Sequence, residues 1–191
     1  MQITDPRALR ALAHPLRLEL VELLGTLGHA TAAVCARRLA TSQASCSFHL
    51  RQLAKYGFVE QAPPSEDSRE RPWRLTDLEQ NWSADAGPAA DQLERVFVQR
   101  EADRILAWLA ADDDSPTAWQ KTSFVGGATV PVTVDELDSI RTELRGILEP
   151  YIRRLSDRTD WPDDTRFVRF LLAGTPLALT DSTGPDSEET A

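Results

Sequence analysis

The segment from Thr31 to Leu75 constrains the fold most, because it carries four short elements in a fixed order. A helix is predicted over 31–39, and a connection rich in hydroxyl side chains, Ala40-Thr41-Ser42-Gln43, caps a second helix over 43–56. Gly57 supplies a left-handed helix cap, and two short β-rich stretches, 58–62 and 71–75, flank a polar tip with two prolines.

A further helical pattern precedes this segment. Leucines recur at helical spacing over residues 5–25, Asp5-Pro6 is a good helix start, and Pro15 should break the pattern near His14. The predicted order is a helix, a second helix, a tight connection, a third helix and two strands. This is the order of elements in a winged helix-turn-helix. We therefore expect a winged helix-turn-helix DNA-binding domain over residues 1–78.

The helix predicted over 43–56 has two different faces. Cys46, Leu50 and Leu53 cluster on one side and should face the core. No acidic residue occurs from Cys35 to Val59, which suits a helix lying in a DNA major groove. A solvated face with some arginines is the structural alternative. The predicted DNA contacts are Gln43, Ala44, Ser45, Ser47, Phe48, Arg51 and Lys55 on the helix, and Arg69, Arg71 and Arg74 on the wing.

The net charge of −9 argues against a nucleic-acid partner when the chain is taken whole. Residues 1–75 hold ten Lys/Arg and seven Asp/Glu, a balance of +3, whereas residues 76–191 hold eleven and twenty-three, a balance of −12. The acidity therefore belongs to the second part, and a mildly basic first part can approach an anion.

The second part is expected to be an α+β dimerisation region, 79–178, that follows a linker over 76–89. A long helix over 89–111 has two apolar faces, so it should lie between two packing partners, one of them another protomer. Strands are predicted over 122–134 and 166–172, a capping box at 133–136 opens a last helix, and residues 179–191 form a disordered acidic tail. The predicted dimer contacts are Leu93, Val96, Phe97, Val98, Ile105 and Leu109.

The fold class is thus mainly α with small β elements. Aromatic side chains from several elements of the second part either line an apolar pocket for a small effector or simply pack in a core. These are Trp108, Trp119, Phe124, Tyr151, Trp161, Phe167 and Phe170.

Three stretches of the first part resemble the bacterial ArsR-type transcriptional repressors: Leu12-Ala13-His14-Pro15-Leu16-Arg17, the run from Thr41 to Leu53, and Gly57-Phe58-Val59-Glu60. The resemblance covers about residues 7–78. It implies a homodimeric DNA-binding regulator whose third helix enters the major groove, with Gln43, Ala44, Ser47 and Phe48 where the family reads bases. Phe48 departs from the polar residue often found there, and it either contacts a thymine methyl or packs on sugar.

Metal sensing and catalysis are not expected. Metal-sensing members of the family carry a Cys-x-Cys pair or convergent carboxylate and histidine ligands, whereas Cys35 and Cys46 are separate and His14, His29 and His49 are dispersed. Buried structural cysteines and a packing and hydrogen-bonding role for His49 are the favoured interpretation. The sequence contains no nucleotide-binding loop, nucleophile elbow or zinc-protease motif, so we predict no enzyme, no metal and no cofactor.

The sequence therefore predicts a DNA-binding transcriptional regulator, a repressor that binds a palindromic operator as a homodimer. The alternative is a winged-helix module that binds a protein partner through the acidic second part. Neither a membrane span nor a secretory signal is visible, so a cytoplasmic protein is expected. The sequence names neither the operator nor an effector.

Overall fold

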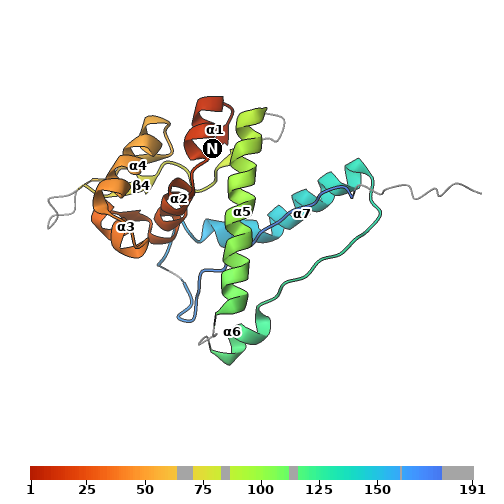
Figure 1. The fold of residues 1–191 in the computed structure, drawn as a ribbon. Coiled ribbons are helices and arrows are strands. Elements are labelled where there is room, and N and C mark those ends of the chain that lie inside the picture. Colours follow the sequence, from red (N-terminus) through yellow and green to blue (C-terminus); the bar gives the residue numbers. More distant parts are fainter. Residues whose placement is uncertain (64–70, 83–86, 112–115, 160, 178–191) are drawn as a thin grey trace, which may run out of the picture.

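The computed structural model describes residues 1–63, 71–82, 87–111, 116–159 and 161–177 (Figure 1). We call residues 1–63 and 71–82 the head and residues 116–177 the arm; α5 lies between them (Figure 1). No helix in these ranges is long and apolar enough to cross a membrane. In chain order the elements are β1 (Gln2–Ile3), α1 (Pro6–Leu12), α2 (Pro15–Leu27), β2 (His29–Ala30), α3 (Ala32–Arg38), α4 (Gln43–Lys55), β3 (Val59–Gln61), β4 (Trp73–Leu75), β5 (Asn81–Trp82), α5 (Pro88–Ala110), α6 (Thr117–Thr122) and α7 (Val134–Arg153).

The helices of the head begin and end where the sequence signals predict. Asp5 caps α1 by accepting a 2.8 Å hydrogen bond from the Arg7 amide, and the predicted break at Pro15 separates α1 from α2. Proline fits the first turn of α2 because its missing N–H would have no helical partner there. The leucine pattern is therefore divided between two helices, both of which pack against α4 and α5.

The predicted wing is confirmed in its two strands. β3 and β4 pair antiparallel, with Val59 opposite Leu75 and Gln61 opposite Trp73. Unpredicted β2 joins the other edge of β4, so the sheet order is β2-β4-β3. The wing tip, 64–70, lies outside the described residues. A second small sheet was also not predicted: β1 pairs parallel with β5, which lies within the expected linker.

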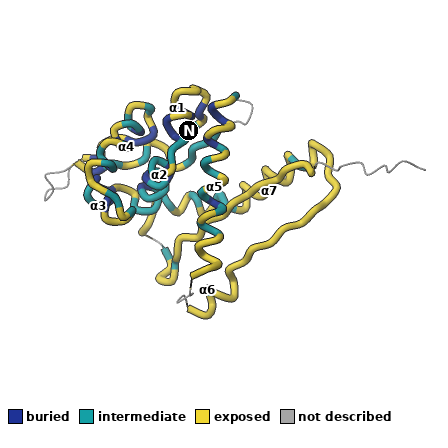
Figure 2. Tube along the Cα trace, in the orientation of Figure 1, coloured by how far each residue is buried: buried dark blue, intermediate teal, exposed yellow. Residues whose placement is uncertain are grey.

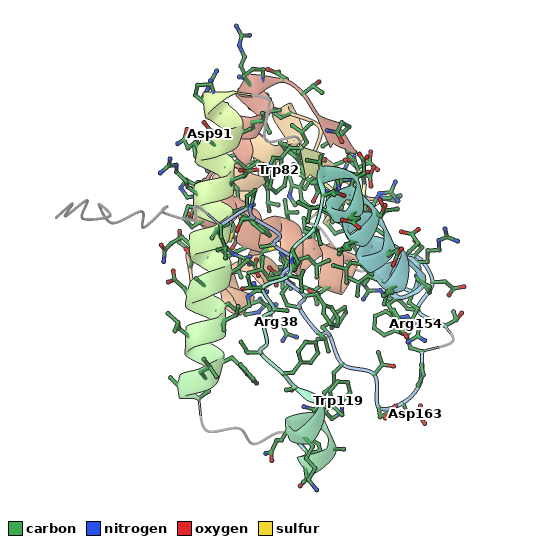
Figure 3. The ribbon with its side chains drawn as sticks, turned by 90° about the vertical axis from the view of Figure 1, so that its right-hand side faces the viewer. Arg38, Trp82, Asp91, Trp119, Arg154 and Asp163 are labelled. Atoms are coloured by element: carbon green, nitrogen blue, oxygen red, sulfur yellow. The ribbon has the colours of Figure 1, made fainter. Side chains whose placement is uncertain are left out.

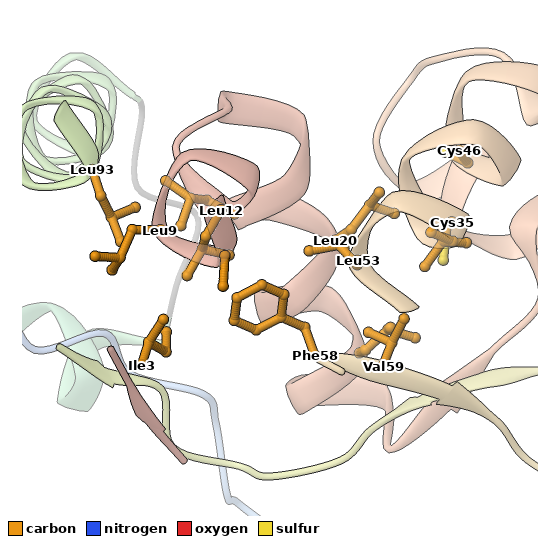
Figure 4. Close-up of a cluster of buried hydrophobic side chains, with 14 of the residues drawn as sticks. Ile3, Leu9, Leu12, Leu20, Cys35, Cys46, Leu53, Phe58, Val59 and Leu93 are labelled. Atoms are coloured by element: carbon orange, nitrogen blue, oxygen red, sulfur yellow. The ribbon is translucent and has the colours of Figure 1, made fainter. Parts of the chain in front are cut away.

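The hydrophobic core fills the centre of the head (Figure 4). Phe58, directly after α4, is fully buried, and leucines of α1, α2 and α4 surround it. Leu93 of α5 joins the same cluster beside Leu9 and Leu12, so the first half of α5 belongs to the core of the head. The core of the head thus combines its four helices, α1 to α4, and the wing with a helix contributed by the second part of the chain.

This packing changes the expected dimer contacts. Leu93 is fully buried, and Val96 and Phe97 pack against the core of the head, where the Phe97 ring meets Trp82 at a centroid distance of 5.8 Å. Leu93 is therefore not available to a second protomer, whereas Val96 and Phe97 are half-buried against the head. Val98 and Leu109, on the opposite side of α5, are 54% and 61% exposed.

Ion pairs join α5 to the head on one side and to the arm on the other. Glu22 of α2 accepts hydrogen bonds from Arg100 and from Arg104, the latter at 2.6 Å. Glu101, only 1% exposed, pairs with Arg100 at 2.9 Å and takes a two-point contact from Arg169, with Nε and Nη2 at 3.1 and 2.9 Å. A buried carboxylate is stable only with such partners, so Glu101 fixes the path of the arm across α5.

The arm is mostly exposed (Figure 2). The capping box of α7 is confirmed, with Thr133 and Glu136 bonded reciprocally. The strands predicted over 122–134 and 166–172 are wrong: Thr122 ends α6, Val134 begins α7, and neither the residues between them nor residues 166–172 have a ladder partner among the described residues. β-Branched composition favours an extended backbone, yet a strand also requires a neighbour that supplies hydrogen bonds. The second segment lies along α7 instead, where a Cβ on Gly174 would be 3.2 Å from Leu137 Cδ1.

Substitution of two phenylalanines tests which side chains form the core. We expect Phe58→Ala to lower the free energy of unfolding by about 3–5 kcal/mol, because it removes a fully buried ring. Phe48→Ala is the matched control, since the Phe48 ring is 51% exposed on α4 and its loss should cost under about 1 kcal/mol. Urea unfolding followed by circular dichroism measures both; equal losses would contradict the assigned core.

Candidate nucleic-acid interface

The rotation of α4 about its axis is fixed by one apolar side. Cys46, Leu50 and Leu53 are each fully buried, which confirms the predicted core face. The opposite side is exposed along its length, and it comprises Ala44, Phe48, Arg51 and Lys55. Gln43 is exposed as well, whereas Ser45 and Ser47 are half-buried at the flanks. The helix therefore presents small, aromatic and cationic side chains to solvent, with no carboxylate.

Both ends of α4 are held by local hydrogen bonds. The Ser42 hydroxyl accepts from the Ser45 amide at 3.1 Å, which caps the first turn. At the other end Gly57 adopts a φ of +75°, a conformation that glycine enters without strain, and the chain turns directly into buried Phe58. Thr76, just after β4, donates its hydroxyl to the Gly57 carbonyl at 2.6 Å and ties the wing to the end of α4.

Two of the three predicted wing arginines lie in the described part of the chain. Arg71 is exposed two residues before β4, at the tip end of that strand, and Arg69 lies outside the described residues. Arg74 pairs across the sheet with Glu60, through Nε at 2.8 Å and a second nitrogen at 2.7 Å. Arg74 is therefore already neutralised, and it makes a weaker candidate for a phosphate contact than Arg71.

A cluster that the sequence did not predict lies beside the exposed face of α4. The ring of His49 contacts the ring of His14, which precedes α2, at a centroid distance of 4.5 Å and an interplanar angle of 41°. Nδ1 of both rings and Nε of nearby Arg17 are buried without a hydrogen-bond partner in the described residues. The expectation that His49 hydrogen-bonds in the core is not met at this atom. We call His14, Arg17 and His49 the histidine cluster.

The histidine cluster favours neutral imidazoles. Burial lowers the pKa of His14, and the positive charge of Arg17 lowers it further. Burial likewise lowers the pKa of His49, with additional repulsion from His14 and Arg17. Glu19 opposes these effects weakly at His14. Nothing in the sequence alone could reveal this arrangement, since the three residues come from two helices that meet only in the folded head.

The cysteines are buried thiols. Burial raises the pKa of Cys35 to about 11 and also raises the pKa of Cys46, so neither is a thiolate near neutral pH. Among the residues that the structure describes, no group of three or more His, Cys, Asp or Glu side chains is arranged to hold a metal ion.

The aromatic residues of the second part do not form a common pocket. Phe124, Tyr151 and Phe167 are 77%, 57% and 54% exposed, and Trp161 contacts Phe167 edge-on at 5.5 Å (Figure 3 shows the side chains of the arm). A cavity of about 800 Å³ lies elsewhere, between α2 and α5. Leucine, valine and charged side chains line it, including Leu23, Val96, Glu22, Arg100 and Arg104, and none of the seven aromatic residues takes part.

Residues 12–62 match the family model of a helix-turn-helix domain, which spans α2, α3, α4 and β3. These residues therefore form a helix-turn-helix domain. The fold of the head and this match together support a DNA-binding transcriptional regulator. No curated protein matches the chain in sequence.

Solved structures of ZitR from Lactococcus lactis are similar to this chain. A single mutant is 17% identical over 70% of this chain and 73% of its own, with a TM-score of 0.29. A double mutant in the apo form is 19% identical over 71% and 83% of the two chains, with a TM-score of 0.30. At these TM-scores the likeness does not extend the assignment beyond the helix-turn-helix domain.

The histidine cluster should make folding depend on pH. The pKa values of His14 and His49 lie below the ordinary 6.5, so the unfolded chain binds more protons than the folded one as the pH falls through that value. We expect the free energy of unfolding to decrease between about pH 7.5 and 5.5, above the range where carboxylates titrate.

The double variant His14→Gln/His49→Gln should show a smaller decrease over the same range, as measured by urea unfolding at each pH. His29→Gln is the matched control, because His29 is exposed on β2 and should leave the pH dependence unchanged. A double variant with the wild-type slope would contradict the assignment.

Proposed function

We propose that the protein is a sequence-specific repressor that binds a palindromic site on double-stranded DNA as a homodimer. In this proposal α4 lies in the major groove, and the wing, residues 60–75, lies on the backbone or in the minor groove. One observation carries it: the exposed side of α4 is free of acidic residues, and the burial of Cys46, Leu50 and Leu53 turns that side outward.

The chemistry of the exposed side suits DNA. Gln43, Ala44, Ser45 and Ser47 lie in the first turns of α4, where a recognition helix contacts base edges with amide, hydroxyl and methyl groups. Phe48, half exposed one turn further on, suits a thymine methyl or a sugar.

Two cations follow along the same side of α4. Arg51 and Lys55 are exposed and suit the phosphates at the groove edge, as does exposed Arg71 just before β4 of the wing. Repression would follow if the occupied site overlaps a promoter, because bound protein excludes the polymerase.

The homodimer is supported by apolar surface that the chain leaves uncovered. The far half of α5 exposes Leu106 and Leu109 at 63% and 61%, and α7 exposes Ile147 and Tyr151 at 63% and 57%. The largest exposed apolar patch of a typical monomer covers about 300–600 Å², and larger patches mark interaction sites. For comparison, a stable interface buries about 800 Å² per partner. The extended segments of the arm also carry unpaired backbone groups that a second copy can satisfy.

Arg51→Ala is expected to weaken DNA binding by about 1–3 kcal/mol without affecting folding or dimerisation, since Arg51 is exposed. Fluorescence anisotropy with a duplex selected from random sequences measures the affinity. For wild type the log–log slope of affinity against salt should be about −7, if each protomer neutralises about four phosphates.

The matched control is Arg141→Ala on α7, where the side chain pairs with Asp138 far along the chain from the helix-turn-helix domain. It should bind DNA as wild type does. Equal affinity for Arg51→Ala and wild type would show that another face binds DNA, and a flat salt response would favour the alternative of a protein partner.

Leu109→Glu should dissociate the proposed homodimer, because it places a charge in the apolar surface at the end of α5. Sedimentation velocity should then show a monomer, and affinity for a palindromic duplex should fall because two linked half-sites no longer act together. Leu78→Glu is the control, since Leu78 is also exposed but lies in the head. A monomeric wild type, or a dimer that survives the Leu109 change, would contradict this interface.

A further inference from the structure

The histidine cluster borders the exposed face of α4. His49 follows Phe48 in the helix, and the two rings meet edge to face at a centroid distance of 5.1 Å. The ring of His14, which precedes α2, lies 4.5 Å from the ring of His49 between centroids, with the two planes tilted by 41°. The cluster therefore connects the beginning of α2 to Phe48, which is among the predicted base contacts.

Three nitrogen atoms of the cluster lack partners. His14 Nδ1, His49 Nδ1 and Arg17 Nε are buried, and no described residue offers them a hydrogen bond. Burying a polar atom without a partner costs free energy, because the atom loses its hydrogen bonds to water. Three such atoms on three neighbouring side chains suggest a place where a ligand completes the hydrogen bonding.

The charges around the cluster favour an anion. Arg17 carries a fixed positive charge, and each imidazole gains a further positive charge when it is protonated. Glu19 of α2 is the carboxylate whose negative charge raises the pKa of His14. Burial lowers the pKa of Arg17, and the charge interaction with Tyr56, at the end of α4, opposes this effect. A metal ion fits poorly, because Arg17 would repel it and the described residues supply no third ligand.

We propose that His14, Arg17 and His49 bind one backbone phosphate of the duplex, and that an imidazole takes up a proton from solvent as the phosphate arrives. This inference rests on the proposed function, since it places the cluster at the edge of the DNA-bound face of α4. The phosphate supplies acceptors for the unpartnered nitrogens, and its negative charge offsets the repulsion that keeps the imidazoles neutral in the free protein. DNA binding therefore strengthens as the pH falls.

The experiment measures affinity for a mixed-sequence duplex about two helical turns long at several pH values between about 5.5 and 8, at fixed salt. A phosphate contact is independent of sequence, so this probe requires no operator. We expect wild-type affinity to rise about tenfold over this range, the change produced by a shift of one pKa unit at one group. His14→Gln/His49→Gln should remove most of this rise, and His29→Gln should retain it.

The general decrease in negative charge on acidification affects all three proteins alike, so only the difference between them reports on the cluster. Calorimetry in two buffers of different ionisation enthalpy provides a second readout: wild type should take up about half a proton per protomer on binding DNA near pH 6.5, which is the most that a shift of one pKa unit produces, and the double variant should take up almost none. Equal pH dependence and equal proton uptake would overturn the inference. Absence of DNA binding at every pH would instead overturn the proposed function.

Discussion

Burial of Cys46, Leu50 and Leu53 is the constraint on which the DNA-facing surface depends. Successive residues of a helix are offset by about 100°, so a rotation of α4 by one residue would move all three side chains toward solvent. Full burial of one leucine is worth about 1.5–3 kcal/mol, and the loss of several would approach the 5–15 kcal/mol that stabilises a domain. The packing of the core therefore determines which side of α4 is exposed. The exposed residues themselves do not contribute to this orientation.

α5 connects the two parts of the chain by two kinds of interaction. Near its start Leu93 lies in the core of the head; further along, Glu22 and Glu101 hold arginines of α5 and of the arm. Burial opposes ionisation of Glu22, but hydrogen bonds from Arg104 and Arg100 outweigh it and keep the pKa of Glu22 below its ordinary value. Removing one partner of a buried pair costs about 3–5 kcal/mol, so this network couples the position of the arm to that of the head.

The elements that the sequence predicted best are those whose signals are local. The Asp5, Ser42 and Thr133 caps, the break at Pro15 and the turn at Gly57 each depend on a few neighbouring residues. The strands of the arm were predicted wrongly because pairing depends on a distant segment. β1 and β5 were missed for the same reason, since two-residue strands carry almost no pattern of their own.

The sequence by itself determined the helix-turn-helix order, the core side of α4 and the separation of a basic first part from an acidic second part. Helical periodicity, capping residues and the distribution of charge are properties of the sequence, because they do not depend on contacts between distant residues. Only the tertiary structure decided that Leu93, Val96 and Phe97 belong to the head, that Arg74 is paired with Glu60, and that His14 meets His49. These contacts join residues far apart in the chain, and their partners are chosen by packing in three dimensions, which no local pattern encodes.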